Sequence, residues 1–422
     1  MSGAGMSENA APRHRLLPYI MLGVLGPLSF IVVLSPFIWW LAHFSAMNPI
    51  IPWRINDFPM FWASGHFAAS LTPGRVYTRP LLLVWEYRHV LGYHHTDPFV
   101  YPPPTLLLTR LIDFSGYWRA YLLWTIALTT LSVLILRIAH LPWIVIGFAI
   151  LNPASFFTLM LGQISLLTGC CFVASLLLID RAPIRSGVFS ALTLFKPQIA
   201  LLGPLAILAR NNWRGVVAGL VVVGTICLLT WVIFGSSLWL AYVNHGLQSS
   251  HKLLDLPYPR PAFGPNYRGG YEYAEISVFY MLRSFGLKIS SAMIGQTLSA
   301  LGASMLCWRL WRREDIDPTI RVAITIFLGV LVTPYGFIQD LSAFSLGVLL
   351  LIWRRGTLEV GDVILLMWPG TLGLISQIIG ATITPLVIAW ALLRAHRLQQ
   401  FVSISNGDYD APIVLKGDHA DI

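Results

Sequence analysis

Stretches of about 20 apolar residues recur along nearly the whole chain, and this pattern limits what the chain can fold into. The 422 residues are 56% hydrophobic and only 11% charged, whereas soluble chains carry about 25% charged residues. Each long apolar run can cross a hydrocarbon core of about 30 Å. The alternating pattern of a membrane barrel is absent, so we expect an all-α integral membrane protein, a bundle of transmembrane helices.

The apolar runs predict about twelve spans in a single domain over residues 1–400, followed by a disordered tail at 401–422. The first run, Leu17 to about Phe44, is too long for a signal peptide and is interpreted as a retained helix. Arginines such as Arg137, Arg210 and Arg354 fall in short turns between runs, which is typical of cytoplasmic loops. This pattern places both termini in the cytoplasm. It also attributes the net charge of +9 to membrane topology and not to a nucleic-acid partner.

Two segments between the apolar runs are too long to be simple connections, and both fall on the outer side of the predicted topology. They extend from about Met47 to Tyr117 and from about Gly235 to Leu287. In the first we expect a short interfacial helix over Phe58–Ala69, with Asn56 or Asp57 as its N-cap. A second interfacial helix or a membrane re-entry is expected over about Thr105 to Phe114.

Asp57 follows the first span closely and opens the first long loop. A carboxylate at the mouth of a helical bundle, among aromatic residues, suits a general base that takes a proton from a hydroxyl group. The other interpretation is a helix N-cap or a solvated loop acid.

Lys196 lies in an apolar stretch, between two short arms at Arg185–Phe195 and Ile199–Ala209 that predict a broken helical hairpin. Charged residues at membrane depth are costly and are usually functional or paired. A lysine at this place suits a phosphate group. Extension of the side chain to the membrane surface is the alternative.

Further polar and aromatic residues are candidates for binding a substrate. Gln163 and Gln198 either bind a sugar or join helices, while Asp340 either pairs with Lys196 or an arginine, or lines the site. Tyr101 either stacks on a sugar ring or belongs to an interfacial aromatic belt. Tyr335, which precedes Asp340 after a proline, is a further candidate. In the second loop, Arg260 and Arg268 are candidates for the donor phosphate and His251 for a substrate, and ordinary surface polarity is the other interpretation of each.

Several kinds of chemistry have no support in the sequence. There is no phosphate-binding Walker loop, no dinucleotide fingerprint and no Ser-His-Asp signature at a usable spacing. The histidines lack companions at metal-ligand spacing, and the four cysteines lie in apolar runs as small hydrophobic residues. We therefore expect no cofactor and no metal.

Four ordered blocks of residues resemble membrane glycosyltransferases of the GT-C fold, and most of all glycosyltransferase family 87. This family includes bacterial mannosyltransferases that use polyprenyl-phosphate mannose. The blocks are Asp57-Phe58 with Phe61-Trp62-Ala63; Gly74-Arg75-Val76-Tyr77 with Phe99-Val100-Tyr101-Pro102-Pro103; Gly162-Gln163 with Gly187, Lys196-Pro197-Gln198, Arg210 and Trp213-Arg214; and Thr333-Pro334-Tyr335 with Asp340.

The resemblance implies a GT-C-like fold in the bacterial inner membrane, with the active site facing the periplasm. It implies transfer of a hexose, mannose by default, from a polyprenyl-phosphate sugar to a hydroxyl of an envelope glycan or glycolipid. In that reaction Asp57 would be the general base and Lys196 would lie near the lipid phosphate. A transporter or flippase of lipid-linked glycans is the alternative, and it would need access from both sides of the membrane.

Overall fold

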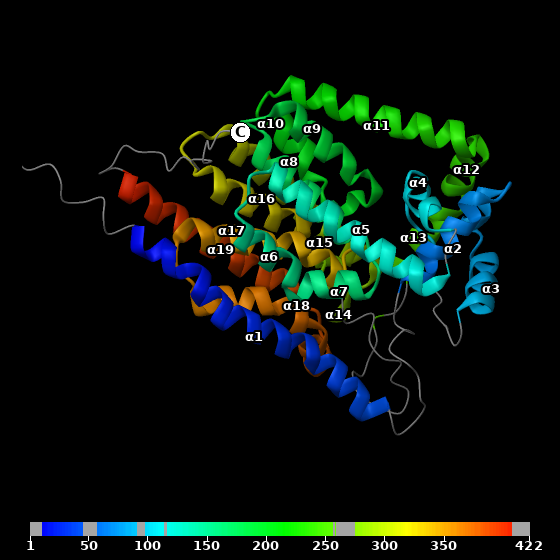
Figure 1. The fold of residues 1–422 in the computed structure, drawn as a ribbon. Coiled ribbons are helices and arrows are strands. Elements are labelled where there is room, and N and C mark those ends of the chain that lie inside the picture. Colours follow the sequence, from blue (N-terminus) through cyan, green and yellow to red (C-terminus); the bar gives the residue numbers. More distant parts are fainter. Residues whose placement is uncertain are drawn as a thin grey trace, which may run out of the picture.

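The computed structural model describes residues 11–44, 57–90, 98–113, 116–255, 258 and 275–406. These residues form α-helices joined by short 3-10 or π-helical turns, and within them there is one isolated β-bridge and no β-strand. The prediction of an all-helical chain is therefore confirmed for the described ranges (Figure 1).

The first half of the chain forms helices of very different lengths. They are α1 (Ala11–Phe44), α2 (Phe58–Ala69), η2 (Pro73–Tyr77), α3 (Arg79–His89), α4 (Thr105–Thr109), η3 (Arg110–Ile112), α5 (Tyr117–Ile138), α6 (Trp143–Leu151), α7 (Pro153–Met160), α8 (Ser165–Leu178), α9 (Pro183–Leu192), η4 (Thr193–Phe195), η5 (Pro197–Ile199), α10 (Leu202–Ala209) and α11 (Trp213–Phe234).

The second half begins with short helices and ends with a group of longer ones. They are α12 (Ser236–Ala241), η6 (Tyr242–Gly246), α13 (Leu247–Leu254), α14 (Val278–Ser284), α15 (Ile289–Arg312), α16 (Pro318–Val332), η8 (Ile338–Leu341), α17 (Ser342–Arg355), α18 (Val360–Ile379) and α19 (Thr384–Asn406).

Few of these helices are long and apolar enough to cross a membrane. Three of them qualify by length and composition, over Leu16–Val33, Tyr117–Ile138 and Trp213–Phe234. A fourth span results if α6 and α7, which meet at a bend of 55°, are counted together. The predicted number of about twelve spans is thus not confirmed, because many of the apolar runs form shorter or broken helices.

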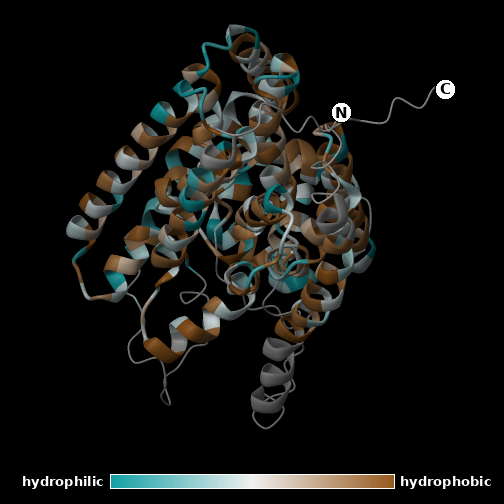
Figure 2. Ribbon diagram, turned by 90° about the vertical axis from the view of Figure 1, so that its left-hand side faces the viewer, coloured by the Kyte–Doolittle hydropathy of each residue, from teal (hydrophilic) through white to brown (hydrophobic). Residues whose placement is uncertain are grey.

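The centre of the bundle consists of such short helices. At 1.5 Å per residue, the 14 residues of α8 and the 15 residues of α16 extend only about 21–23 Å. Nearly every residue of α8, and most of α16 and α17, is buried against neighbouring helices. By contrast, α1, α5 and α11 expose many large apolar side chains. Apolar residues therefore run along the outside of the bundle as well as inside it (Figure 2).

The broken hairpin predicted around Lys196 is present. Its arms are α9 and α10, and the chain between them forms two 3-10 turns, η4 and η5, on either side of Lys196. Pro197 contributes to the break because proline has no N–H to continue a helix. The break leaves Lys196 inside the bundle with 3% of its surface exposed.

The arginine-rich turns lie together at one end of the bundle. Asp180, just after α8, pairs with Arg210 at the end of α10, and Asp317 at the start of α16 pairs with Arg354 at the end of α17. Arg394 of α19 binds Asp362 at the start of α18. The opposite ends of α8 and α17 carry the candidate site, so the arginines and the site lie at opposite ends of the same helices.

The last helix extends past residue 401. Residues 401–406 are the last residues of α19, and residues 407–422 fall outside the described residues. Disorder beyond Asn406 stays a prediction. The helix continues here because the segment up to Asn406 contains no proline or glycine that would end it.

A glycine contact joins α9 to α11. Gly215 and Gly219 are one turn apart on α11, and both face Gly187 of α9. A Cβ added at Gly187 would overlap the carbonyl oxygen of Gly215. Small residues at such spacing let two membrane helices approach closely.

We therefore expect Gly187→Ala to lower stability, because the two backbones must separate to admit the methyl group. Overpacking of this kind costs about 1–3 kcal/mol. The measurement is thermal unfolding of the purified protein in detergent. Gly224→Ala is the matched control on α11, where a Cβ would meet no atom within 4 Å. Equal unfolding temperatures for the two variants would contradict the close approach of α9 and α11.

Candidate active site

Asp57 is buried at the start of α2, with 3% of its surface exposed. Its backbone N–H donates to the carbonyl oxygen of Leu161 at 2.9 Å. Asp57 occupies the N-cap position, but its side chain makes no capping hydrogen bond to α2. Instead Oδ2 accepts a hydrogen bond from Nε2 of Gln163 at 2.6 Å. Its carboxylate is therefore directed to another part of the bundle, which the N-cap interpretation does not explain.

Gln163 lies in the turn between α7 and α8, and the turn has a fixed shape. Gly162 has a φ of +70°, and a Cβ there would lie 2.5 Å from Cβ of Phe58. The carbonyl oxygen of Gly162 accepts a hydrogen bond from Nε1 of Trp124 at 2.8 Å. A left-handed backbone at this position favours glycine. Glycine thus lets the turn approach α2 closely enough for Gln163 to reach Asp57.

Lys196 has three polar partners in the interior. Its Nζ lies 2.6 Å from Oδ1 of Asp340, 2.7 Å from Oγ of Ser165 and 3.4 Å from Oε1 of Gln163. An ammonium group has three protons to donate, so all three are engaged. Among the alternatives for Asp340 left open by the sequence, the structure contains the ion pair with Lys196.

Asp340 is held from two sides. Its Oδ1 also accepts a hydrogen bond from the Ser165 hydroxyl at 2.7 Å, and its Oδ2 accepts one from the backbone N–H of Phe337 at 3.1 Å. The adjacent Gln339 is anchored through its carbonyl oxygen, which accepts a hydrogen bond from Thr158 of α7 at 2.9 Å. The turn before α17 is therefore tied to both α7 and α8.

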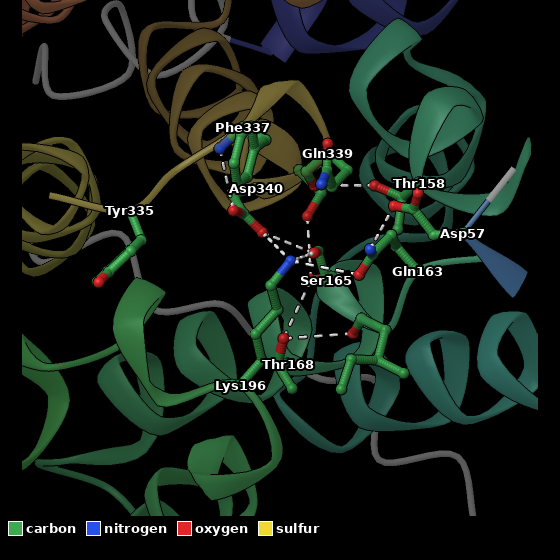
Figure 3. Close-up of polar contacts among 12 residues, drawn as sticks. Asp57, Thr158, Gln163, Ser165, Thr168, Lys196, Tyr335, Phe337, Gln339 and Asp340 are labelled. Carbon is green, nitrogen blue, oxygen red and sulfur yellow. Dashed lines mark hydrogen bonds and ion pairs between the residues drawn. The ribbon is translucent and has the colours of Figure 1, made fainter. Parts of the chain in front are cut away.

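Five of the predicted site residues form one connected network. Figure 3 shows four of them, Asp57, Gln163, Lys196 and Asp340. Asp57, Gln163, Lys196 and Asp340 are each 3% exposed, and Tyr101 is 6% exposed. With both carboxylates and the ammonium ionised, the network has two negative charges and one positive charge. Lys196 pairs with Asp340 and reaches Asp57 only through Gln163.

Tyr101 supports the network from the first long loop. Its hydroxyl donates to Oε1 of Gln163 at 2.5 Å, and its ring packs against Phe61 of α2. The carbonyl oxygen of Tyr101 accepts a hydrogen bond from the hydroxyl of Tyr77 at 2.8 Å. Burial, with a smaller effect of the nearby Tyr242, raises the pKa of Tyr77 well above its usual value. Tyr77 therefore stays neutral and keeps its proton for this bond.

Three other predicted residues lie apart from the network. Gln198 is partly exposed on η5, and His251 is exposed on α13. Tyr335 lies to one side in Figure 3, and its hydroxyl donates to the carbonyl oxygen of Ser250 at 2.6 Å. Burial, and secondarily Asp255, raises the pKa of Tyr335 to about 12. Arg260 and Arg268 lie outside the described residues. Contact of these five residues with a substrate stays a prediction.

Ser165, which is not among the predicted site residues, contacts both charges of the ion pair. Its signal in the sequence is weak, since it is a single serine at the start of an apolar run, two residues after Gln163. Glu275 is another buried residue that was not among the predicted site residues. It is 5% exposed and forms the isolated bridge with Phe337, close to Asp340 along the chain.

The fold and this site define a helical membrane protein with a buried, charged network at one end of the bundle. The sequence model of glycosyltransferase family 87 matches residues 99–334, which is more than half of the chain. The chain belongs to this family, and it is therefore a membrane glycosyltransferase that uses a sugar donor and an acceptor. No curated protein and no solved structure gives a match.

The matched range covers part of the network. Tyr101, Gln163 and Lys196 lie within it, whereas Asp57 and Asp340 lie outside it. Both carboxylates nevertheless contact residues of the matched range directly.

We expect removal of either member of the buried ion pair to destabilise the protein. Lys196→Met leaves the Asp340 carboxylate buried without its counter-charge, and Asp340→Leu does the same to Lys196. Breaking a buried pair costs about 3–5 kcal/mol, whereas replacing both members by apolar residues costs less. The double variant should therefore be more stable than either single variant in thermal unfolding.

Arg313→Met provides the comparison for this prediction. Arg313 pairs with Asp315 on the surface, where both side chains are more than 60% exposed. Surface pairs contribute little, so this variant should unfold at nearly the wild-type temperature. If the loss of stability in the double variant Lys196→Met/Asp340→Leu equals the sum of the losses in the two single variants, the two residues do not stabilise each other.

Proposed function

We propose that this family 87 glycosyltransferase transfers a hexose from a polyprenyl-phosphate sugar to a hydroxyl of an envelope glycan or glycolipid. Mannose is the default sugar. Transfer inverts the anomeric carbon, with Asp57 as the general base. The single observation that carries the proposal is the buried Asp57 carboxylate, held by Gln163 in a network that also contains Lys196 and Asp340.

The proposed reaction needs one proton transfer and one displacement. Asp57 takes the proton of the acceptor hydroxyl as its oxygen attacks the anomeric carbon. The bond from this carbon to the phosphate oxygen breaks, and its electron pair leaves with the polyprenyl phosphate. Since phosphate is a good leaving group, the step uses no separate general acid and no cofactor.

The two carboxylates of the network have different contacts. Asp340 lies 2.6 Å from Nζ of Lys196, and Asp57 accepts a hydrogen bond from the amide of Gln163. Asp340 is thus engaged by Lys196, and we assign Asp57 as the base.

In the proposed reaction the negatively charged donor phosphate must be contacted by cations, and Lys196 is the cation of the network. Lys196 reaches a phosphate by giving up its longest bond, which is to Gln163 at 3.4 Å. Among the described residues of the network, two carboxylates face one ammonium group. We propose Arg260 and Arg268 as further cations that contact the phosphate. Gln198, Tyr335 and His251 remain candidates for contact with the sugar or the acceptor.

We place the site at the periplasmic face of a bacterial inner membrane, in a GT-C-like bundle of about twelve spans with cytoplasmic termini. This is supported by the arginine-rich turns at the opposite end of α8 and α17, since arginine is enriched in cytoplasmic loops. Because Asp57 is 3% exposed, the surrounding elements must move when the acceptor binds.

The test uses purified protein in lipid, radiolabelled polyprenyl-phosphate mannose and an extract of envelope glycolipids. We expect label in a new glycolipid and release of free polyprenyl phosphate. Asp57→Asn should reduce the rate at least about 100-fold, because the amide accepts no proton from the acceptor.

Asp113→Asn is the matched control, because Asp113 is a partly exposed acid beside His66 and lies outside the network. It should keep wild-type turnover. Near-normal turnover of Asp57→Asn would remove Asp57 from the mechanism. Movement of a lipid-linked glycan across the bilayer without release of polyprenyl phosphate would favour a transporter.

A further inference from the structure

The amide of Gln163 contacts both Asp57 and Lys196, the two residues to which the proposed reaction gives different substrates. Its Nε2 donates to Asp57, and its Oε1 accepts from Tyr101 and lies 3.4 Å from Nζ of Lys196. Asp57 would face the acceptor in the proposed reaction, and Lys196 would face the donor phosphate. One side chain therefore contacts a residue assigned to each substrate.

The orientation of this amide is determined from two sides. Tyr101 and Lys196 come from different parts of the chain, and both donate to the same oxygen of Gln163. An amide group has one accepting oxygen and one donating nitrogen, so the NH2 group is left to face Asp57. A flipped amide would place its oxygen against the Asp57 carboxylate and its N–H groups against two donors.

The backbone also fixes the distance between Gln163 and Asp57. The N–H of Gln163 donates to Thr158 at 2.9 Å, and the N–H of Asp57 donates to Leu161 at 2.9 Å. Both residues are thus bound to the same end of α7. The side-chain bond between them is short, at 2.6 Å, and buried, so it is part of a rigid arrangement.

We propose that Gln163 is a positioning residue, which holds the Asp57 carboxylate in place and is itself held by Tyr101 and Lys196. This differs from the role of sugar ligand, which was one of the two roles that the sequence left open for Gln163, and it rests on the proposed function of Asp57. Gln163 has both ends of its amide engaged inside the protein, which leaves it poorly suited to bind a sugar hydroxyl.

The proposal has a chemical consequence for the base. A hydrogen bond donated to a carboxylate favours the charged form, whereas a second carboxylate at the same distance disfavours it. The other charged or titratable groups of the network are Lys196, Asp340 and Tyr101. A change of Gln163 to glutamate keeps an oxygen that can accept from Tyr101 and Lys196. It replaces the donor to Asp57 by a second carboxylate oxygen, which adds a negative charge beside both Asp57 and Lys196.

The experiment measures kcat and KM against pH for Gln163→Glu, alongside wild type and Asp57→Asn. We expect the acidic limb of the kcat profile to move up by about one pH unit or more, since like charges raise the pKa of a carboxylate. At the wild-type optimum kcat should fall by about 10-fold or more, and it should recover as the pH rises. KM for the acceptor should stay within about twofold, because the loss of an interaction made only in the transition state lowers kcat and not binding.

Two further variants keep the test decisive. Tyr101→Phe removes one of the two donors to Gln163 while keeping the ring, and it should lower kcat about 2- to 10-fold without raising KM, as for the loss of one hydrogen bond. Gln248→Glu is the matched control on the exposed face of α13, and its pH profile should equal that of wild type. If a thermal unfolding assay shows that Gln163→Glu does not fold, the kcat and KM of Tyr101→Phe alone test the proposal.

The outcomes separate this proposal from the function on which it rests. If Gln163→Glu raises KM for donor or acceptor and leaves the acidic limb in place, Gln163 is a substrate ligand and the proposal is wrong. The proposal is also wrong if Tyr101→Phe raises KM without changing kcat. If Asp57→Asn keeps normal turnover, the assignment of the base fails, whatever Gln163 does.

Discussion

The buried ion pair between Lys196 and Asp340 is the contact on which the rest of the site depends. Removing a charge from water costs several kcal/mol per ion, and only good geometry with further hydrogen bonds offsets this cost. Here Ser165 and the N–H of Phe337 complete the partners of Asp340, and Ser165 and Gln163 complete those of Lys196. The pair thereby joins the break between α9 and α10 to the start of α17 across α8.

The arrangement of the other polar groups follows from this pair. Lys196 pairs with Asp340, and Asp57 accepts a hydrogen bond from the amide of Gln163. The same amide accepts from Lys196, so the network is continuous from one carboxylate to the other (Figure 3). Tyr101 donates to the same amide oxygen. In the proposed reaction Asp57 accepts a proton and Lys196 meets a phosphate, and the side chain of Gln163 lies between these two residues.

The sequence predicted local features well and longer-range ones poorly. The bounds of α2 and the break at Lys196 were found because proline, a capping position and an apolar run are properties of neighbouring residues. The predicted number of spans was not confirmed, because an apolar run does not show whether it forms a full span or a short buried helix such as α8. Ser165 was missed because a single serine in an apolar run is common.

The sequence by itself determined that the chain is helical, that it lies in a membrane and where its arginines gather, because hydropathy and charge are read from adjacent residues. It also placed polar residues near the ends of particular helices. Only the tertiary structure decided which of them meet. Gln163 and Asp57 are 106 positions apart, and Ser165 and Asp340 are 175 apart. Contacts over such separations depend on how helices bend and pack, as at Gly162, and no local pattern encodes them.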